Sequence, residues 1–274
     1  MIENTVPTSA SETLCKICGM SMEPFGHAKI LGRHLARYFR CSACGFICTE
    51  FPYWLEEAYS SAIAKQDVGI LQRNLLNREV TTAVLNLLYP EVTRLVDYGA
   101  GHGIFVRLMR DRGFDFDWHD RYATNDYARG FEYDNRKRYH FLTAFEVLEH
   151  LCDPIPELSA MMELSENIFV STVLVPNPVP AVPHWWYFMP SSGQHVSFYT
   201  RKSLQLLARR FNRNLLTYGP YHLFTAKTKS QFLFRFATRA KIAAILNCAY
   251  RRPSLIESDF LQMTESAMRG NDLL

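Results

Sequence analysis

The feature that most constrains this 274-residue chain is a glycine-rich turn between a short apolar run and a helix-like segment. Residues 95–98 form an apolar run that carries Asp97 and predicts a buried strand, and residues 104–109 have the apolar spacing of a helix. Three glycines stand at alternate positions between them: Gly99, Gly101 and Gly103. Glycine suits a sharp turn with positive φ and lets a ligand approach the backbone closely. A strand, a glycine turn and a helix in this order predict a nucleotide-binding corner.

A candidate ribose ligand follows, at about 20 positions after the glycine turn. Residues 114–120 alternate between apolar and polar side chains, which predicts a second strand. In nucleotide-binding folds, an acidic side chain at the end of this strand accepts hydrogen bonds from ribose hydroxyls. We expect Asp120 in this role, or Asp117 if the strand ends earlier, with Arg121 lining the adenosine.

Four cysteines form two Cys-x-x-Cys pairs, separated by 22 residues: Cys15, Cys18, Cys41 and Cys44. Each pair ends in a Cys-Gly step that lets the backbone curl around the sulfur atoms. Four thiolates make the closed tetrahedral set of a structural zinc, which leaves no position for direct chemistry. His27 and His34, between the pairs, are the alternative ligands.

Composition limits the class of protein. The content of hydrophobic residues, 48%, is that of a globular chain, and an odd count of seven cysteines favours an intracellular metal site over a disulfide framework. No apolar run approaches the roughly 20 residues that span a bilayer, and residues 1–5 lack the features of a signal peptide. A net charge of +3 is too small to indicate a nucleic-acid partner. We therefore expect a cytoplasmic protein without membrane insertion.

Two further runs carry candidate reactive side chains. The expected strand over residues 139–145 leads into Glu146-Val147-Leu148-Glu149-His150-Leu151, in which Glu149 and His150 are expected to make local hydrogen bonds. Residues 176–190 are rich in proline and aromatic side chains and predict a substrate lid. The lid is followed by His195, just before an expected helix cap at Thr200.

These motifs together resemble those of the class I S-adenosylmethionine (SAM) methyltransferases. The Asp-x-Gly-x-Gly-x-Gly pattern is similar to motif I of that family, and the run after residue 145 is similar to motif IV. The resemblance implies an α/β fold, with a Rossmann-like sheet, helices on both faces and a small zinc-ribbon-like N-terminal module. It implies SAM as the cofactor, bound by these residues besides Asp120 and Arg121: Asp97, Gly99, Ala100, Gly101, Gly103 and Glu146.

The same resemblance suggests an order of parts along the chain. The stretch between Phe131 and Thr143 is short, so the third unit of the sheet must be abbreviated, and residues 213–226 should form the final antiparallel hairpin. The role of the C-terminal part, as an oligomer interface, a partner surface or a sheet cover, stays open. We expect a zinc-binding module (1–50), a helical linker (51–90), a SAM-binding domain (91–226) and a helical extension (227–274).

The cysteine module followed by this core resembles the sugar C-methyltransferases, which act on nucleotide-linked deoxysugars. Their active-site run is Tyr-His-Glu-His-Val-Ser, and here His195 matches the essential histidine, while Ser192 and Gln194 replace the tyrosine and the glutamate. The resemblance implies methyl transfer to a small molecule such as a nucleotide-linked sugar. We expect His195 as general base and Glu146 as a second catalytic residue; the alternative for His195 is a structural histidine that fixes the lid by hydrogen bonding. The replacements leave the accepting atom open.

The alternative function is that of a zinc-ribbon methyltransferase acting on RNA. In that case the cysteine module and the basic residues 33–40 would grip the nucleic acid. The small net charge and the aromatic, proline-rich lid favour a small substrate instead.

Overall fold

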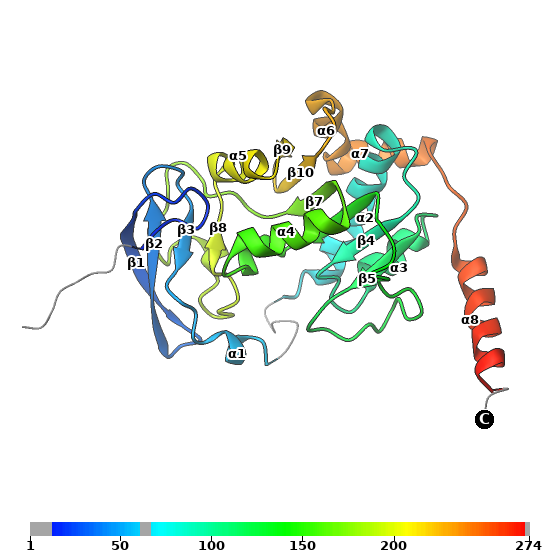
Figure 1. Cartoon of the computed structure of the whole chain (residues 1–274), viewed down its shortest axis with the longest axis horizontal. Helices are drawn as coiled ribbons and strands as arrows, with labels where there is room; N and C mark the ends of the chain where they lie inside the picture. Colours follow the sequence, from blue (N-terminus) through cyan, green and yellow to red (C-terminus); the bar gives the residue numbers. More distant parts are fainter. Residues whose placement is uncertain (1–12, 61–66, 272–274) are drawn as a thin grey trace, which may run out of the picture.

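A six-stranded sheet lies at the centre of the molecule, with strands in the order β5-β4-β6-β7-β10-β9 (Figure 1). The structure is a computed structural model that describes residues 13–60 and 67–271. Residues 1–12, 61–66 and 272–274, which belong to the expected zinc-binding module, linker and C-terminal extension, lie outside the described residues. β5, β4, β6 and β7 run parallel, and β10 pairs antiparallel with β7 and β9. The strands are β4 (Leu95–Tyr98), β5 (Phe116–His119), β6 (Phe141–Phe145), β7 (Asn167–Ser171), β9 (Asn214–Tyr218) and β10 (Tyr221–Thr225).

Helices cover both faces of this sheet because successive strand residues point to opposite sides. Leu95 packs with α2 (Ile70–Leu88), α3 (Ile104–Arg110), α6 (Gln231–Ala237) and α7 (Ala240–Ala249). Its neighbour Val96 packs on the other face with α4 (Pro154–Leu164) and α5 (Arg201–Arg210). The expected α/β fold class, with helices on both faces of the sheet, is confirmed.

The third unit of the sheet is as short as expected. Glu132 makes an isolated parallel bridge to Trp118 at the edge of β5, and the described residues 120–140 contain no regular strand. The Trp118 amide donates to the Phe131 carbonyl at 2.7 Å, and the Tyr133 amide donates to the Trp118 carbonyl at 2.8 Å. The short stretch before β6 thus adds one bridge to the edge of the sheet in place of a strand.

A second, four-stranded sheet joins the N-terminal part to a distant segment, in the order β1-β2-β3-β8. β1 (Met22–Ile30), β2 (His34–Cys41) and β3 (Ile47–Thr49) are consecutive, whereas β8 comprises Ser197–Phe198. Ile47 pairs with Phe198 and Cys48 pairs with Ser197, and Figure 1 shows β8 beside β3. The segment that contains His195 is therefore attached to the N-terminal sheet.

The aromatic segment 176–190 packs onto this second sheet. Trp185, Tyr187 and Phe188 are buried in one core with Tyr38 of β2 and with Trp54, which precedes α1 (Leu55–Ala58). The segment that was expected to form a lid is thus held against the N-terminal sheet by its aromatic rings.

The C-terminal helix α8 (Ile256–Asn271) extends along one end of the molecule (Figure 1). It is attached by buried Asp259, which accepts hydrogen bonds from the Arg110 guanidinium at 2.7 and 2.9 Å. Among the described residues, no helix is both long enough and apolar enough to cross a membrane.

A fully buried histidine, His222 of β10, stabilises the junction between β7 and β10. Its Nε2 donates to the Thr172 carbonyl at 3.1 Å, so Nδ1 is left to accept from the Thr217 hydroxyl at 2.6 Å. Burial lowers the pKa of His222 to about 4. The neutral ring is therefore the form that fits the folded protein.

We predict that His222 makes the free energy of unfolding fall as the pH falls from 6.5 towards 4. The unfolded chain binds a proton near pH 6.5 and the folded chain only near pH 4, so this side chain alone costs about 2 kcal/mol at pH 5 relative to pH 8. Urea unfolding of His222→Gln at several pH values should lack this component, whereas His27→Gln, at an exposed position of β1, should retain it. Equal pH dependence in His222→Gln and in the parent protein would contradict the assignment.

Candidate functional site

One cavity of about 1290 Å³ lies at the carboxyl ends of β4, β5 and β6. Ligand pockets for small molecules have volumes of about 300–1000 Å³, so this space is sufficient for a cofactor together with a second small molecule. Its lining includes most of the residues expected from the sequence: Asp97, Gly99, Ala100, Gly101, Asp120, Arg121, Glu146 and His195. Gly103, which was also expected to bind the cofactor, does not line this cavity.

The three glycines of the turn all have positive φ, but their surroundings differ. A β-carbon at Gly99 would lie 2.7 Å from Val147 Cγ2, and one at Gly103 would lie 2.8 Å from Asn125 Oδ1. A β-carbon at Gly101 would have no atom of the described residues within 4 Å. Packing within the protein thus requires glycine at positions 99 and 103, whereas position 101 faces open space beside the cavity.

Asp120 follows β5 directly and holds the glycine turn in place. Its Oδ2 accepts from the Gly101 amide at 2.9 Å, and its Oδ1 accepts from the amides of Tyr122 and Ala123 at 2.7 and 2.8 Å. Asp117, the alternative ribose ligand, lies earlier in β5, accepts from the Tyr139 hydroxyl at 2.7 Å and does not line the cavity. Of the two candidates, only Asp120 reaches the cavity.

Asp97 lies within β4 and is buried beneath the turn. Its Oδ1 accepts from the Thr143 hydroxyl at 2.6 Å, and burial raises its pKa to about 7. Arg121, the next residue after Asp120, lies with its guanidinium 3.1 Å from the Glu157 carboxylate and stays more than half exposed. These residues form the polar rim and floor of the end of the cavity nearest the glycine turn.

Glu146 is the first residue after β6 and has an unusual backbone conformation for a non-glycine residue, with φ of 54°. Ser171, at the end of β7, donates through its hydroxyl to Glu146 Oε1 at 2.6 Å and accepts from the Glu146 amide at 3.0 Å. Such strained conformations persist where surrounding contacts hold them and are concentrated at functional sites.

His195 also lines this cavity and is buried, with 7% of its surface exposed. Its Nδ1 donates to the Tyr187 carbonyl at 2.7 Å, since a carbonyl can only accept, so Nε2 of the neutral ring carries a free lone pair. Burial lowers its pKa to about 4, below the value near 6.5 that the sequence alone suggests. The ring is therefore neutral at pH 7.

Two residues that sequence reasoning assigned to local hydrogen bonds lie beside His195. Glu149 and His150 belong to the short 3₁₀ helix η1 (Leu148–His150), and one ligand atom from each of Glu149, His150 and His195 lies within 4.8 Å of the others. Glu149 Oε1 accepts from the Tyr187 hydroxyl at 2.6 Å. In the sequence, the adjacent Glu149 and His150 after a strand indicate a site of reactive side chains. Their proximity to His195 follows only from the fold.

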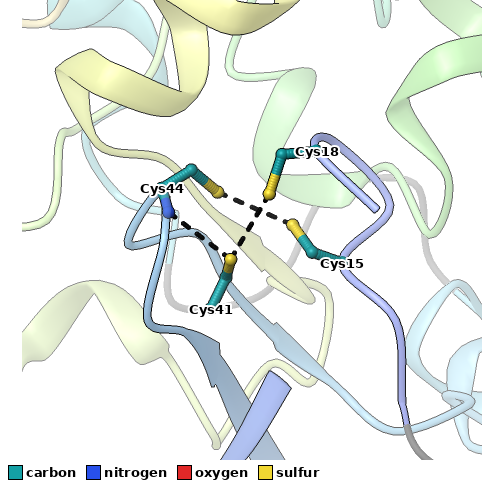
Figure 2. A group of neighbouring side chains, drawn as sticks. All are labelled: Cys15, Cys18, Cys41 and Cys44. Carbon is teal, nitrogen blue, oxygen red and sulfur yellow. Dashed lines mark hydrogen bonds between the residues drawn. The ribbon is translucent and has the colours of Figure 1, made fainter. Parts of the chain in front are cut away.

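The four cysteines of the two pairs converge, and Figure 2 shows their sulfur atoms pointing toward one another. The Sγ atoms of Cys15 and Cys44 are 3.6 Å apart, and those of Cys18 and Cys41 are 3.4 Å apart. All four are free thiols. Among the described residues, neither of the alternative ligands, His27 and His34, belongs to this cluster.

Comparison with known proteins identifies the family. Residues 71–218, more than half of the chain, match the model of a methyltransferase domain. No curated protein matches the chain significantly.

Several solved structures are similar to part of the chain. An O-methyltransferase family protein from Burkholderia thailandensis has 13% identity and a TM-score of 0.44, over 62% of this chain and 66% of that one. The plantazolicin methyltransferase BpumL, in complex with SAH, has 12% identity and a TM-score of 0.45, over 71% and 85% of the two chains. Human N-acetylserotonin methyltransferase, in complex with SAM, has 14% identity and a TM-score of 0.43, over 64% and 66%. The chain thus spans slightly less than two thirds of the first and third of these proteins.

The residues matched by the family model include the glycine turn, Asp120, the run after β6 and His195. They also include five of the six strands of the central sheet, and β10 lies just beyond the match. The chain therefore belongs to the methyltransferase domain family.

Proposed function

We propose that the protein transfers the methyl group of SAM to a small-molecule acceptor that binds beside His195. The observation that carries this proposal is that one continuous cavity joins the glycine turn to His195. A cofactor at the first end and an acceptor at the second would then meet inside a single enclosure.

The end near the glycine turn fits SAM. Position 101 has open space beside its backbone, and Asp120 directs a carboxylate to the cavity, with one lone pair of Oδ2 left for a ribose hydroxyl. Arg121 and Tyr122 follow Asp120 in the lining, and the Tyr122 ring stacks on Tyr59 with centroids 5.9 Å apart. We place the adenosine along this side and the methionine part toward the turn.

Catalysis at such a site requires mainly positioning and removal of a proton. SAM supplies a methyl group on a sulfonium, which the acceptor attacks in line. We assign activation of the acceptor to His195 and Glu146, both of which line the cavity. The neutral His195 ring has the free Nε2 lone pair that this task needs.

A small acceptor is favoured over RNA. Arg33 and Arg37, which would have to grip nucleic acid, form ion pairs with Glu57 and Glu50, the second with a 2.7 Å contact. Their charges are thus neutralised locally, which weakens the attraction for phosphates. A nucleotide-linked sugar is the acceptor that the sequence resemblance favours.

We further propose that the cysteine cluster binds one structural zinc ion. Tetrahedral Zn–S bonds of about 2.3 Å place sulfur atoms about 3.8 Å apart, close to the separations within this cluster. The cluster is part of one hydrophobic core with Phe46 and Tyr199. An ion bound there would stabilise the sheet that holds the segment of His195.

The first test is cofactor binding by calorimetry with SAM and with its demethylated product. Gly101→Val should abolish binding because it fills the open space beside the turn. Asp120→Ala should weaken binding by about 1.5–3 kcal/mol, the contribution of a hydrogen bond to a charged group. Asp117→Asn is the matched control and should bind normally; unchanged affinity in Asp120→Ala would remove the ribose role from Asp120.

The second test concerns the acceptor end. His195→Ala should bind SAM with nearly unchanged affinity, but its turnover should fall about 10²–10⁴-fold, the typical contribution of a positioned acid–base group. Transfer of radiolabelled methyl from SAM to a panel of nucleotide-linked sugars and other small alcohols would measure this. His184→Ala, at an exposed position in the preceding loop, is the control. A loss of less than tenfold would shift the catalytic role to Glu146.

A further inference from the structure

We propose that Glu149, His150 and His195 bind one divalent transition-metal ion, and that this ion activates a hydroxyl oxygen of the acceptor. The inference rests on the proposed methyl transfer for its chemistry, but the ion-binding site itself is argued from the side chains alone. It is separate from the cysteine cluster and lies at the acceptor end of the cavity.

The three side chains converge from two distant parts of the chain. Glu149 and His150 are neighbours in η1, and His195 comes from the segment just before β8. Their ligand atoms all lie within 4.8 Å of one another. The Val196 amide donates to the Glu149 carbonyl at 2.8 Å, which fixes the two segments against each other.

Both histidine rings are oriented as metal ligands usually are. His195 uses Nδ1 to donate to the Tyr187 carbonyl, and His150 uses Nδ1 in a 2.8 Å hydrogen bond with the Tyr59 hydroxyl. A metal-bound histidine commonly anchors its second nitrogen to a carbonyl or another oxygen in this way. Nε2 of each ring is thereby left available for an ion.

The buried carboxyl group of Glu149 is the strongest support for an ion at this place. The residue is fully buried, and its Oε2 has no hydrogen-bond partner among the described residues. A buried carboxylate oxygen without a partner is costly, and such atoms are rare in folded proteins. Tyr187 meanwhile holds two of the three proposed ligands, with its hydroxyl on Glu149 Oε1 and its carbonyl on His195. A cation between the three groups would supply the missing partner.

The donor set indicates which ions would bind. Two imidazole nitrogens and one carboxylate oxygen suit Zn²⁺, Fe²⁺, Co²⁺ or Mn²⁺, whereas Mg²⁺ and Ca²⁺ prefer oxygen ligands alone. Three protein ligands leave at least one coordination position open, as in catalytic rather than structural sites. His150 and His195 line the cavity, whereas Glu149 is fully buried and does not, so we expect the open position to face the cavity.

Such an ion implies a hydroxyl-bearing acceptor and O-methylation. An oxygen bound to the ion loses its proton more readily, and Glu146 or solvent receives that proton. The resulting oxyanion attacks the methyl carbon of SAM, an O–C bond forms, the C–S bond breaks, and the neutral thioether leaves. In this route His195 acts on the hydroxyl through the ion instead of accepting the proton itself.

Cobalt(II) added to full-length chain that carries one zinc ion per chain, so that only the cysteine cluster is filled, tests the site directly. Thiolate clusters prefer zinc and zinc binds more tightly than cobalt, so the cysteine site should keep its ion, which metal analysis checks. We expect visible absorption bands that saturate near one Co²⁺ per chain. Glu149→Gln and His195→Ala should each weaken binding at least tenfold, while His184→Ala should bind as the parent protein does.

Thermal unfolding provides a second readout that does not depend on activity. Gln at position 149 can keep the hydrogen bond from Tyr187, so Glu149→Gln should fold, and Co²⁺ should raise the Tm of the parent protein but not of this variant. Equal Co²⁺ affinity in the parent and in both variants, or no binding beyond the zinc already present, would overturn the proposal.

SAM titration of the same samples separates the proposed ion site from the proposed methyl transfer. SAM binding without Co²⁺ binding would refute only the ion, and Co²⁺ binding without SAM binding would refute only methyl transfer.

Discussion

The pairing of β3 with β8 is the contact on which the acceptor end of this site depends. Two residue pairs, Ile47 with Phe198 and Cys48 with Ser197, join the cysteine-bearing sheet to the segment that contains His195. The Thr200 hydroxyl adds a 2.6 Å hydrogen bond to the Cys44 carbonyl. A zinc ion in the cysteine cluster would therefore influence catalysis through position alone, by fixing the sheet against which this segment lies.

The two ends of the cavity are built in different ways. The cofactor end is local in sequence, because one strand, one turn and the next strand supply Asp97, the glycines and Asp120. The acceptor end needs distant contacts. The Trp54 indole donates to the Gly193 carbonyl at 2.8 Å, and the Gln194 side chain donates through Nε2 to the Ala58 carbonyl at 2.9 Å. Changes in the N-terminal sheet or in the segment of Trp54 and Ala58 should thus affect binding of the acceptor before they affect binding of the cofactor.

This difference explains how much could be predicted from the sequence. The glycine turn, the parallel strands and the cysteine pairs have local patterns, and the structure confirms the α/β sheet that they predict. β8 has only two residues, too few for any periodicity, so its pairing with β3 could not be anticipated. The burial of Glu149 and its proximity to His195 follow from that pairing. Gly103 lies away from the cavity because its neighbours are Asn125 and Ala128, which no local pattern reveals.

The central claim, that the cysteine module holds the acceptor end in place, is tested most directly by amide hydrogen exchange. The zinc-loaded protein would be compared with Cys41→Ser, whose zinc content is measured in the same samples. Loss of zinc should speed exchange in residues 46–49 and in residues 194–199, while β4 and β6 keep their protection. Unchanged exchange in residues 194–199 of a zinc-free variant would contradict the account.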